Sequence, residues 1–451
     1  MLKRYAKAPH HTMLIEMSLN HLARYLLLSV LTLLWQPAIA AIDGSHLVDR
    51  GLSDISTSPL VYFEDAEASY TPQRAWQRLN ALRDVKQATL PFDQGLADTR
   101  YWLALTLENH SAIEQIMHLV TGIAYAPTLR GYLFYDDDSA SMILDDRPSS
   151  TFTERALPYR HLSSSLFTLP AEGNATLLLE YHPIGSSYLP LQLVSPVDSL
   201  MIQQASSLEA ALFYAFSVST LLFLLLFGIV MSEMVVIRYC GLFTMGLLMI
   251  AAMEGIAFQM VWPGHAEWNH YSPIVLLYLT SAAGFHVARK TLGERAPTTA
   301  RRLLLLFMAT CVLLAAVTPF TSFVTLANMS NLALVTMFAA NVFAISTWAT
   351  QDHATRRFRL GIHVVITIAV VLLIALSISH AMVPSTLYIH SARTVYLIML
   401  LTTVVTLAMH IRSSHRGRLI DLRTSLAEAL SSSSESPKAT MDTHESAAGD
   451  R

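Results

Sequence analysis

Charged residues are scarce in this sequence. Asp, Glu, Lys and Arg make up 14% of the 451 residues, whereas soluble domains usually carry about a quarter. Hydrophobic residues make up 53%. Such a composition indicates that much of the surface faces something other than water.

Cysteine is also nearly absent. The two cysteines, Cys240 and Cys311, both lie in apolar segments, so the segment before them contains no disulfide and depends on packing alone. The formal net charge is −3. This charge excludes the basic footprint of a nucleic-acid-binding protein.

The first 40 residues resemble an export signal. Arg24 precedes the apolar run Tyr25–Trp35, and Ala38–Ala40 has the small residues of a cleavage site. We therefore expect a signal peptide over residues 1–40, with an uncleaved anchor as the alternative. The start codon stays open between three methionines: Met1, Met13 and Met17.

Residues 41–206 have no apolar run long enough to span a membrane. They contain short alternating segments separated by turn-forming residues, which predicts an all-β sandwich in the periplasm. Residues 66–83 are less strand-like and are expected to be partly helical. The expected strands are Trp102–Leu107, Leu129–Tyr135, Ser165–Leu169, Ala175–Tyr181 and Leu189–Val194.

Residues 207–411 read as an all-α, seven-transmembrane helix domain. Each apolar segment can cross a hydrocarbon core of about 30 Å. The seven segments are residues 208–231, 236–260, 271–288, 303–320, 323–348, 360–383 and 388–410.

Positive charge sets the orientation of these helices. Lys and Arg occur in the loops after the first, third and fifth segments and in the tail, but not in the loops after the second, fourth and sixth. Because positive loops stay in the cytoplasm, the β domain is expected in the periplasm and the C-terminus in the cytoplasm of a bacterial inner-membrane protein.

The tail, residues 412–451, is expected to dock and not to catalyse. Its basic start suits the anionic lipid of the inner leaflet, and its end is polar and expected to be partly disordered. Leucines at three- and four-residue steps form one apolar helix face for a partner helix. A free continuation of the seventh helix is the alternative. The leucines are Leu419, Leu422, Leu426 and Leu430.

Several motifs, in this order, resemble the bacterial seven-transmembrane receptors with diverse intracellular signalling modules. The resemblance covers about residues 45–410. The motifs are Tyr101–Asn109, Leu129–Tyr135 and Tyr188–Leu193 in the exported half, and Phe213-Tyr214, Arg238-Tyr239 and Gly255–Trp262 in the membrane half.

This resemblance implies a jelly-roll-like sensory domain, similar to carbohydrate-binding modules, coupled through the helices to a cytoplasmic output. The output is commonly a histidine kinase or a diguanylate cyclase. Neither follows the seventh helix, so we expect such a signalling protein to act in trans. A glycan-binding or envelope-complex membrane module that does not signal is the alternative.

Aromatic side chains on a sandwich face are candidates for the ligand site, because the C–H edges of a sugar ring pack on flat aromatic surfaces. The alternative is that they serve core or rim packing. Asp136–Asp138 offers oxygen ligands for Ca²⁺ but is more simply a hairpin turn. No cofactor is expected. The aromatic candidates are Trp76, Tyr125, Tyr132, Tyr135 and Tyr188.

Glu254 and Arg393 are the ionisable pair expected inside the membrane. Glu254 lies near the outer end of the second segment and Arg393 near the outer end of the seventh, and a rise of 1.5 Å per residue places both at a similar depth. Because charges in lipid require partners, they are expected to form an ion pair. Separate snorkelling to the interface is the alternative.

An intramembrane metal-dependent hydrolase is the third functional class considered. It requires His and acidic ligands that converge at one depth, yet no His-Glu-x-x-His motif and no nucleophile elbow occurs. Neither catalytic residues nor a metal site is therefore expected.

Overall fold

The structure is a computed structural model of the whole chain. It describes residues 55–349 except 83, 125–127, 136–138, 148, 184, 294–296 and 322, together with residues 392–401, 403–405, 419–428 and 430. The expected signal peptide, the sixth apolar segment and the basic start of the tail lie outside the described residues.

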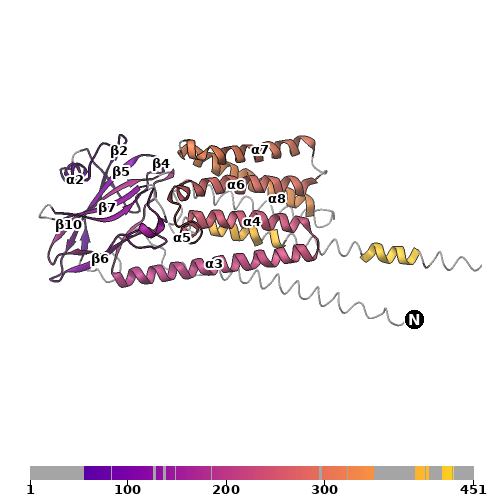
Figure 1. Cartoon of the computed structure of the whole chain (residues 1–451), viewed down its shortest axis with the longest axis horizontal. Helices are drawn as coiled ribbons and strands as arrows, with labels where there is room; N and C mark the ends of the chain where they lie inside the picture. The colour runs from indigo at the N-terminus through magenta and orange to yellow at the C-terminus, as the bar shows by residue number, and fades with distance from the viewer. Residues whose placement is uncertain are drawn as a thin grey trace, which may run out of the picture. The chain divides into compact units, whose positions relative to one another are not determined.

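The N-terminal part is all-β, with antiparallel pairing throughout (Figure 1). Its large sheet has the order β3-β2-β5-β10-β7-β8, with β1 also paired to β5. These strands are β1 (Ile55–Thr57), β2 (Leu60–Asp65), β3 (Lys86–Ala88), β5 (Arg100–Asn109), β7 (Thr128–Tyr135), β8 (Ala140–Asp146) and β10 (Asn174–His182).

Two smaller sheets complete this part. One has the order β12-β6-β9 and the other pairs β11 with β4. Their strands are β4 (Leu96–Ala97), β6 (Gln115–Thr121), β9 (Phe167–Leu169), β11 (Gly185–Ser186) and β12 (Leu191–Val194).

Alternation along the strands gives the large sheet two different faces. On β5, Leu103 and Leu105 join a core with Leu119 of β6 and Leu191 of β12, so the large and three-stranded sheets enclose one apolar layer. The opposite face carries Trp102 and is covered in part by α2 (Pro72–Asn80). The β sandwich and the partial helix expected from the sequence are confirmed.

Apolar helices follow the sandwich. Among the described residues, four helices are long and apolar enough to cross a membrane: α3 (Pro196–Val230), α4 (Met234–Met253), α6 (Ala266–Leu292) and α7 with η4 (Thr298–Phe320). The other described helices are α5 (Ile256–Met260), α8 (Phe323–Ala349) and the helix that contains residues 392–400. Figure 1 shows α3, α4, α6 and α7 running alongside one another.

The first helix begins earlier than its hydropathy predicts. Ser195 accepts a hydrogen bond from the backbone N–H of Asp198, and Pro196 occupies the first turn, so α3 starts directly after β12. The expected boundary at residue 207 therefore falls inside α3. The apolar run therefore covers only part of α3.

The second expected helix, residues 236–260, is not continuous. It breaks at Glu254 and Gly255, where Gly255 has φ +76°, and continues as α5. Glycine adopts this left-handed conformation at little cost, and it is the residue that commonly ends helices in this way. Because of the break, Glu254 lies at the C-terminal end of α4 and not in the middle of a continuous helix.

Candidate functional site

Glu254 and Arg393 come together where α4 ends. Arg393 Nε lies 2.5 Å from Glu254 Oε1, and Arg393 Nη2 lies 2.8 Å from Glu254 Oε2. The two side chains are 17% and 8% exposed. Two parallel N–H···O contacts between a guanidinium and a carboxylate form the strongest geometry available to such a pair.

Helix α3 contributes a second acid and a phenol to this pair. Arg393 Nη1 lies 2.6 Å from Glu209 Oε1, and the Tyr214 hydroxyl donates to Glu254 Oε2 over 3.0 Å. The Arg393 guanidinium lies 5.2 Å from the centre of the Phe213 ring. Arg393 therefore joins α3 and α4 to the helix that contains residues 392–400.

A second arginine reaches the same place from the β region. Arg160 Nη1 lies 4.0 Å from Glu254 Oε2, and Arg160 Nη2 donates to the Ser206 hydroxyl. Arg160 Nη1 is buried and has no hydrogen-bond acceptor among the described residues. We call Arg160, Glu209, Glu254 and Arg393 the junction network.

The junction network balances its charges, with two arginines against two glutamates. Removing a charge from water costs several kcal/mol, so each member depends on its partners. A shift of any one element that carries a member changes the pairing of the others.

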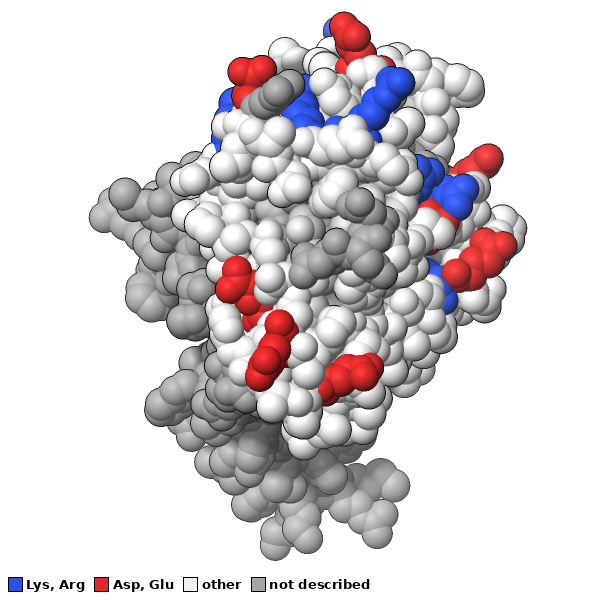
Figure 2. Space-filling model, turned by 90° about the vertical axis from the view of Figure 1, so that its left-hand side faces the viewer, with Lys and Arg blue, Asp and Glu red and all other residues white. Residues whose placement is uncertain are grey.

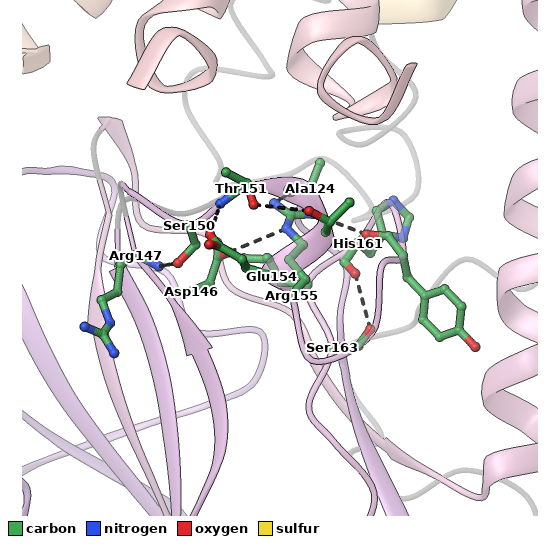
Figure 3. Close-up of polar contacts among 12 residues, drawn as sticks. Ala124, Asp146, Arg147, Ser150, Thr151, Glu154, Arg155, His161 and Ser163 are labelled. Carbon is green, nitrogen blue, oxygen red and sulfur yellow. Dashed lines mark hydrogen bonds and ion pairs between the residues drawn. The ribbon is translucent and has the colours of Figure 1, made fainter. Parts of the chain in front are cut away.

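Arg155 and Asp146 form a buried ion pair in the β region (Figure 3). Arg155 Nε lies 3.5 Å from Asp146 Oδ1, at the end of β8, and both side chains are less than a tenth exposed. Arg155 also donates to three backbone carbonyls, those of Ala124, Tyr159 and Arg160.

Burial dominates the electrostatics of this pair. It raises the pKa of Asp146 to about 6, although Arg155 opposes the shift. Burial also lowers the pKa of Arg155 and of Arg160, but arginine stays protonated in proteins. The pKa of His161 is lowered by burial and by Arg160, so His161 is neutral at pH 7.

Aromatic and polar contacts join the β region to the helices around these charges. Phe152 packs edge-on against Phe258 of α5 with ring centres 5.6 Å apart, and its backbone N–H donates to the Pro263 carbonyl over 3.0 Å. His118 of β6 hydrogen-bonds the Ser199 hydroxyl of α3 over 2.7 Å. The β region is therefore fastened at several points.

Among the described residues, the aromatic ligand candidates do not form one cluster. Trp76 of α2 stacks on Phe134 with ring centres 5.0 Å apart, and Tyr132 lies on the same face of the large sheet. Tyr135 packs against the core of the sandwich instead. Tyr188 lies between β11 and β12, and Tyr125 lies outside the described residues.

Charged side chains of alternating sign lie beside Tyr132. Glu180 bridges Arg100 and Arg130 at 3.0 and 3.1 Å, and Arg130 Nε lies 3.3 Å from Asp145 Oδ1. Figure 2 shows charged groups of both signs along parts of one face of the molecule. Within the described part of the chain, no three His, Cys, Asp or Glu side chains could hold a metal ion.

Sequence reasoning missed three members of this site. Glu209 had a usable signal, since an acid within a helix that becomes apolar requires a partner. Tyr214 belongs to the Phe213-Tyr214 motif of the membrane half. Arg160 had no signal, because it lies in an irregular segment and reaches Glu254 only through the tertiary fold.

A β sandwich joined to apolar helices through a buried ion network defines a membrane protein with a folded domain outside the lipid. Two family models match the chain: "7TM diverse intracellular signalling" over residues 206–409 and "7TMR-DISM extracellular 2" over residues 57–195. The chain therefore belongs to the seven-transmembrane receptors with diverse intracellular signalling modules. No curated protein and no protein of solved structure gives a significant match.

Proposed function

We propose that this receptor binds an extracytoplasmic ligand on its β sandwich and passes the resulting shift into the membrane helices through the junction network. The observation that supports this most directly is Arg160. It belongs to the β region, yet it lies 4.0 Å from Glu254, which is bound to Arg393. The same carboxylate thus faces both the sensory part and the helices.

The geometry suits two arrangements of the network. Arg160 Nη1 is buried without an acceptor, and an unmet buried donor costs about 1–3 kcal/mol. A shift of about 1 Å toward Glu254 would convert the 4.0 Å contact into a hydrogen bond. That hydrogen bond would compete with the Arg393 contacts for the same carboxylate.

The proposed setting is the bacterial inner membrane, with the sandwich in the periplasm and the C-terminus in the cytoplasm. The loop charges support this orientation, since Arg289, Lys290, Arg301 and Arg302 flank the connection between α6 and α7.

The proposed ligand is a carbohydrate or a related envelope component. Tyr132 is a partly exposed aromatic ring with Arg130 and Asp145 nearby on the sheet. An aromatic ring with a few polar groups beside it is the usual composition of a small-molecule site, and it suits the flat face and the hydroxyls of a sugar. Trp76 already stacks on Phe134 and is better explained as packing.

The proposed output is a separate cytoplasmic protein, such as a histidine kinase or a diguanylate cyclase. The helical tail segment supports such docking, because Leu419, Leu422 and Leu426 are about half exposed or more. An apolar face of this kind is suited to pack on a helix of a partner.

Ligand binding by the full-length receptor in lipid nanodiscs tests this proposal. A panel of envelope glycans would be screened, and a hit would be measured again with Tyr132→Ala and Tyr132→Phe. We expect Tyr132→Ala to weaken binding at least about tenfold, or about 1.4 kcal/mol, and Tyr132→Phe to bind as the unmodified receptor does.

The control distinguishes stacking from a general loss of structure, because phenylalanine keeps the flat ring. Equal binding by both variants would remove Tyr132 from the ligand site. The ligand-induced gain in stability would also be compared between the Glu254→Gln variant and the unmodified receptor. Equal gains would indicate a module that binds without signalling.

A further inference from the structure

Neighbouring residues at the end of β8 face opposite sides of the large sheet. Asp145 pairs with Arg130 in register and also forms an ion pair with it. Asp146 follows on the same strand but faces Arg155 in the interior. A movement at the end of β8 therefore reaches both the charged outer face and the buried pair.

Arg155 in turn fixes the backbone that carries Arg160. Its Nη1 donates to the carbonyls of Tyr159 and Arg160 over 3.2 and 3.3 Å, and its Nη2 donates to Ala124 over 2.9 Å. A single guanidinium thus holds the turn that ends at Arg160. Figure 3 shows Arg155 beside Asp146 and Ala124.

We propose that Asp146 and Arg155 are a positioning pair that holds Arg160 beside Glu254, so that strand β8 controls the pairing of the junction network. This inference rests on the proposed function, because it names how the sensory sandwich regulates the network. It assigns Arg155 no contact with ligand.

The shape of the guanidinium explains why the residue is arginine. Three carbonyls and one carboxylate surround it, and its carbon lies 5.4 and 5.2 Å from the ring centres of Phe152 and Phe258. A planar fork satisfies several acceptors at once and stacks on aromatic rings, whereas an ammonium is a compact point charge. Lysine would keep the charge but release the turn.

A double-mutant cycle between Arg155 and Glu254 tests the proposal. Arg155→Lys, Glu254→Gln and the double variant would be purified as full chains, without ligand, and their melting temperatures compared. If Arg155 acts through Arg160, we expect the double variant to lose less than the sum of the single losses. Strictly additive losses would overturn the proposal.

Glu154→Gln is the matched control. Glu154 precedes Arg155, is exposed, and accepts from the Thr151 backbone N–H over 2.7 Å. The loss of melting temperature caused by Glu154→Gln should simply add to the loss caused by Glu254→Gln. Coupling of equal size at Glu154 would mean that any change in this segment disturbs the network, which would contradict a specific role for Arg155.

A second variant keeps the test open if Arg155→Lys does not fold. Asp146→Asn keeps the size of the side chain and removes its charge, and the same deviation from additivity with Glu254→Gln is expected. Neither cycle uses a ligand or a partner protein. Additive losses would therefore contradict the positioning role alone, and a ligand screen without a hit would contradict only the proposed ligand binding.

Discussion

Arg393 and Glu254 form a two-pronged ion pair, although they are 139 residues apart in the sequence. The same guanidinium also contacts Glu209 through Nη1 at 2.6 Å. Because Arg393 serves two acids and Glu254 is bound by one close arginine, the two residues are not equivalent. We therefore expect substitutions of Arg393 and of Glu254 to change the stability of the protein by different amounts.

Replacing Arg393 should cost more stability than replacing Glu254. Arg393→Gln leaves two carboxylates together, whereas Glu254→Gln leaves Arg393 with Glu209. Removing one partner of a buried ion pair costs about 3–5 kcal/mol. The loss for Arg393→Gln should lie below this range, because Glu209 is partly exposed to water. Thermal unfolding in detergent measures both. The double variant should lose less than the sum, and additive losses would show that the side chains act separately.

Gly255→Ala should destabilise the helix break. Gly255 has φ +76°, and an added Cβ would lie 2.8 Å from the Ala124 Cβ. The left-handed conformation alone costs a non-glycine residue about 1–2 kcal/mol. Gly241→Ala is the matched control, since nothing lies within 4 Å of a Cβ there and alanine favours a helix. A Gly255→Ala variant as stable as its control would contradict the break.

Asp146 should give the receptor a stability contribution that falls as pH rises. Its pKa is about 6 in the folded protein, with an ordinary value of 3.8, so between these values the folded state binds more protons than the unfolded state. Stability is then greatest below the lower value and is lost as pH rises through about 6. The shift corresponds to at most about 3 kcal/mol.

Asp146→Asn removes this titration, which melting curves from pH 4 to pH 7 would measure. The variant should gain stability relative to the unmodified receptor as pH rises. The charges that act on Asp146 are those of Arg155, which lowers its pKa, and of Asp145, which raises it. A constant difference between the two proteins across this range would show that Asp146 does not titrate there.

Reporter fusions test the proposed orientation of the helices. Gly264 lies between α5 and α6, and Pro297 lies directly before α7. Alkaline phosphatase is active only outside the cytoplasm, so a fusion at Gly264 should be active and one at Pro297 inactive. The opposite pattern would invert the proposed orientation and place the sandwich inside.

Photocrosslinking from Leu426 tests docking of the tail. Leu426 is 63% exposed on the helix at residues 419–428. We expect a crosslinker at this position to capture one cytoplasmic protein in cells, and a crosslinker at Arg423 to capture less of it. Equal capture at both positions, or none, would leave the tail as a free helix.

The β sandwich, the apolar helices and the need of Glu254 and Arg393 for partners can all be predicted from the amino-acid sequence. Strand alternation and the length of apolar runs depend on local burial, which leaves a pattern in the chain. Lipid tolerates Glu254 and Arg393 poorly when they are alone, and so their presence in apolar segments already implied partners.

The groups that complete the junction network follow from the folded structure and not from any local pattern. Arg160 reaches Glu254 because β strands, a turn held by Arg155 and the break at Gly255 bring distant segments together. No local pattern marks such a contact, since a polar residue in an irregular segment looks the same whether it faces water or a buried carboxylate. The long-range packing of the sandwich on the helices makes that distinction.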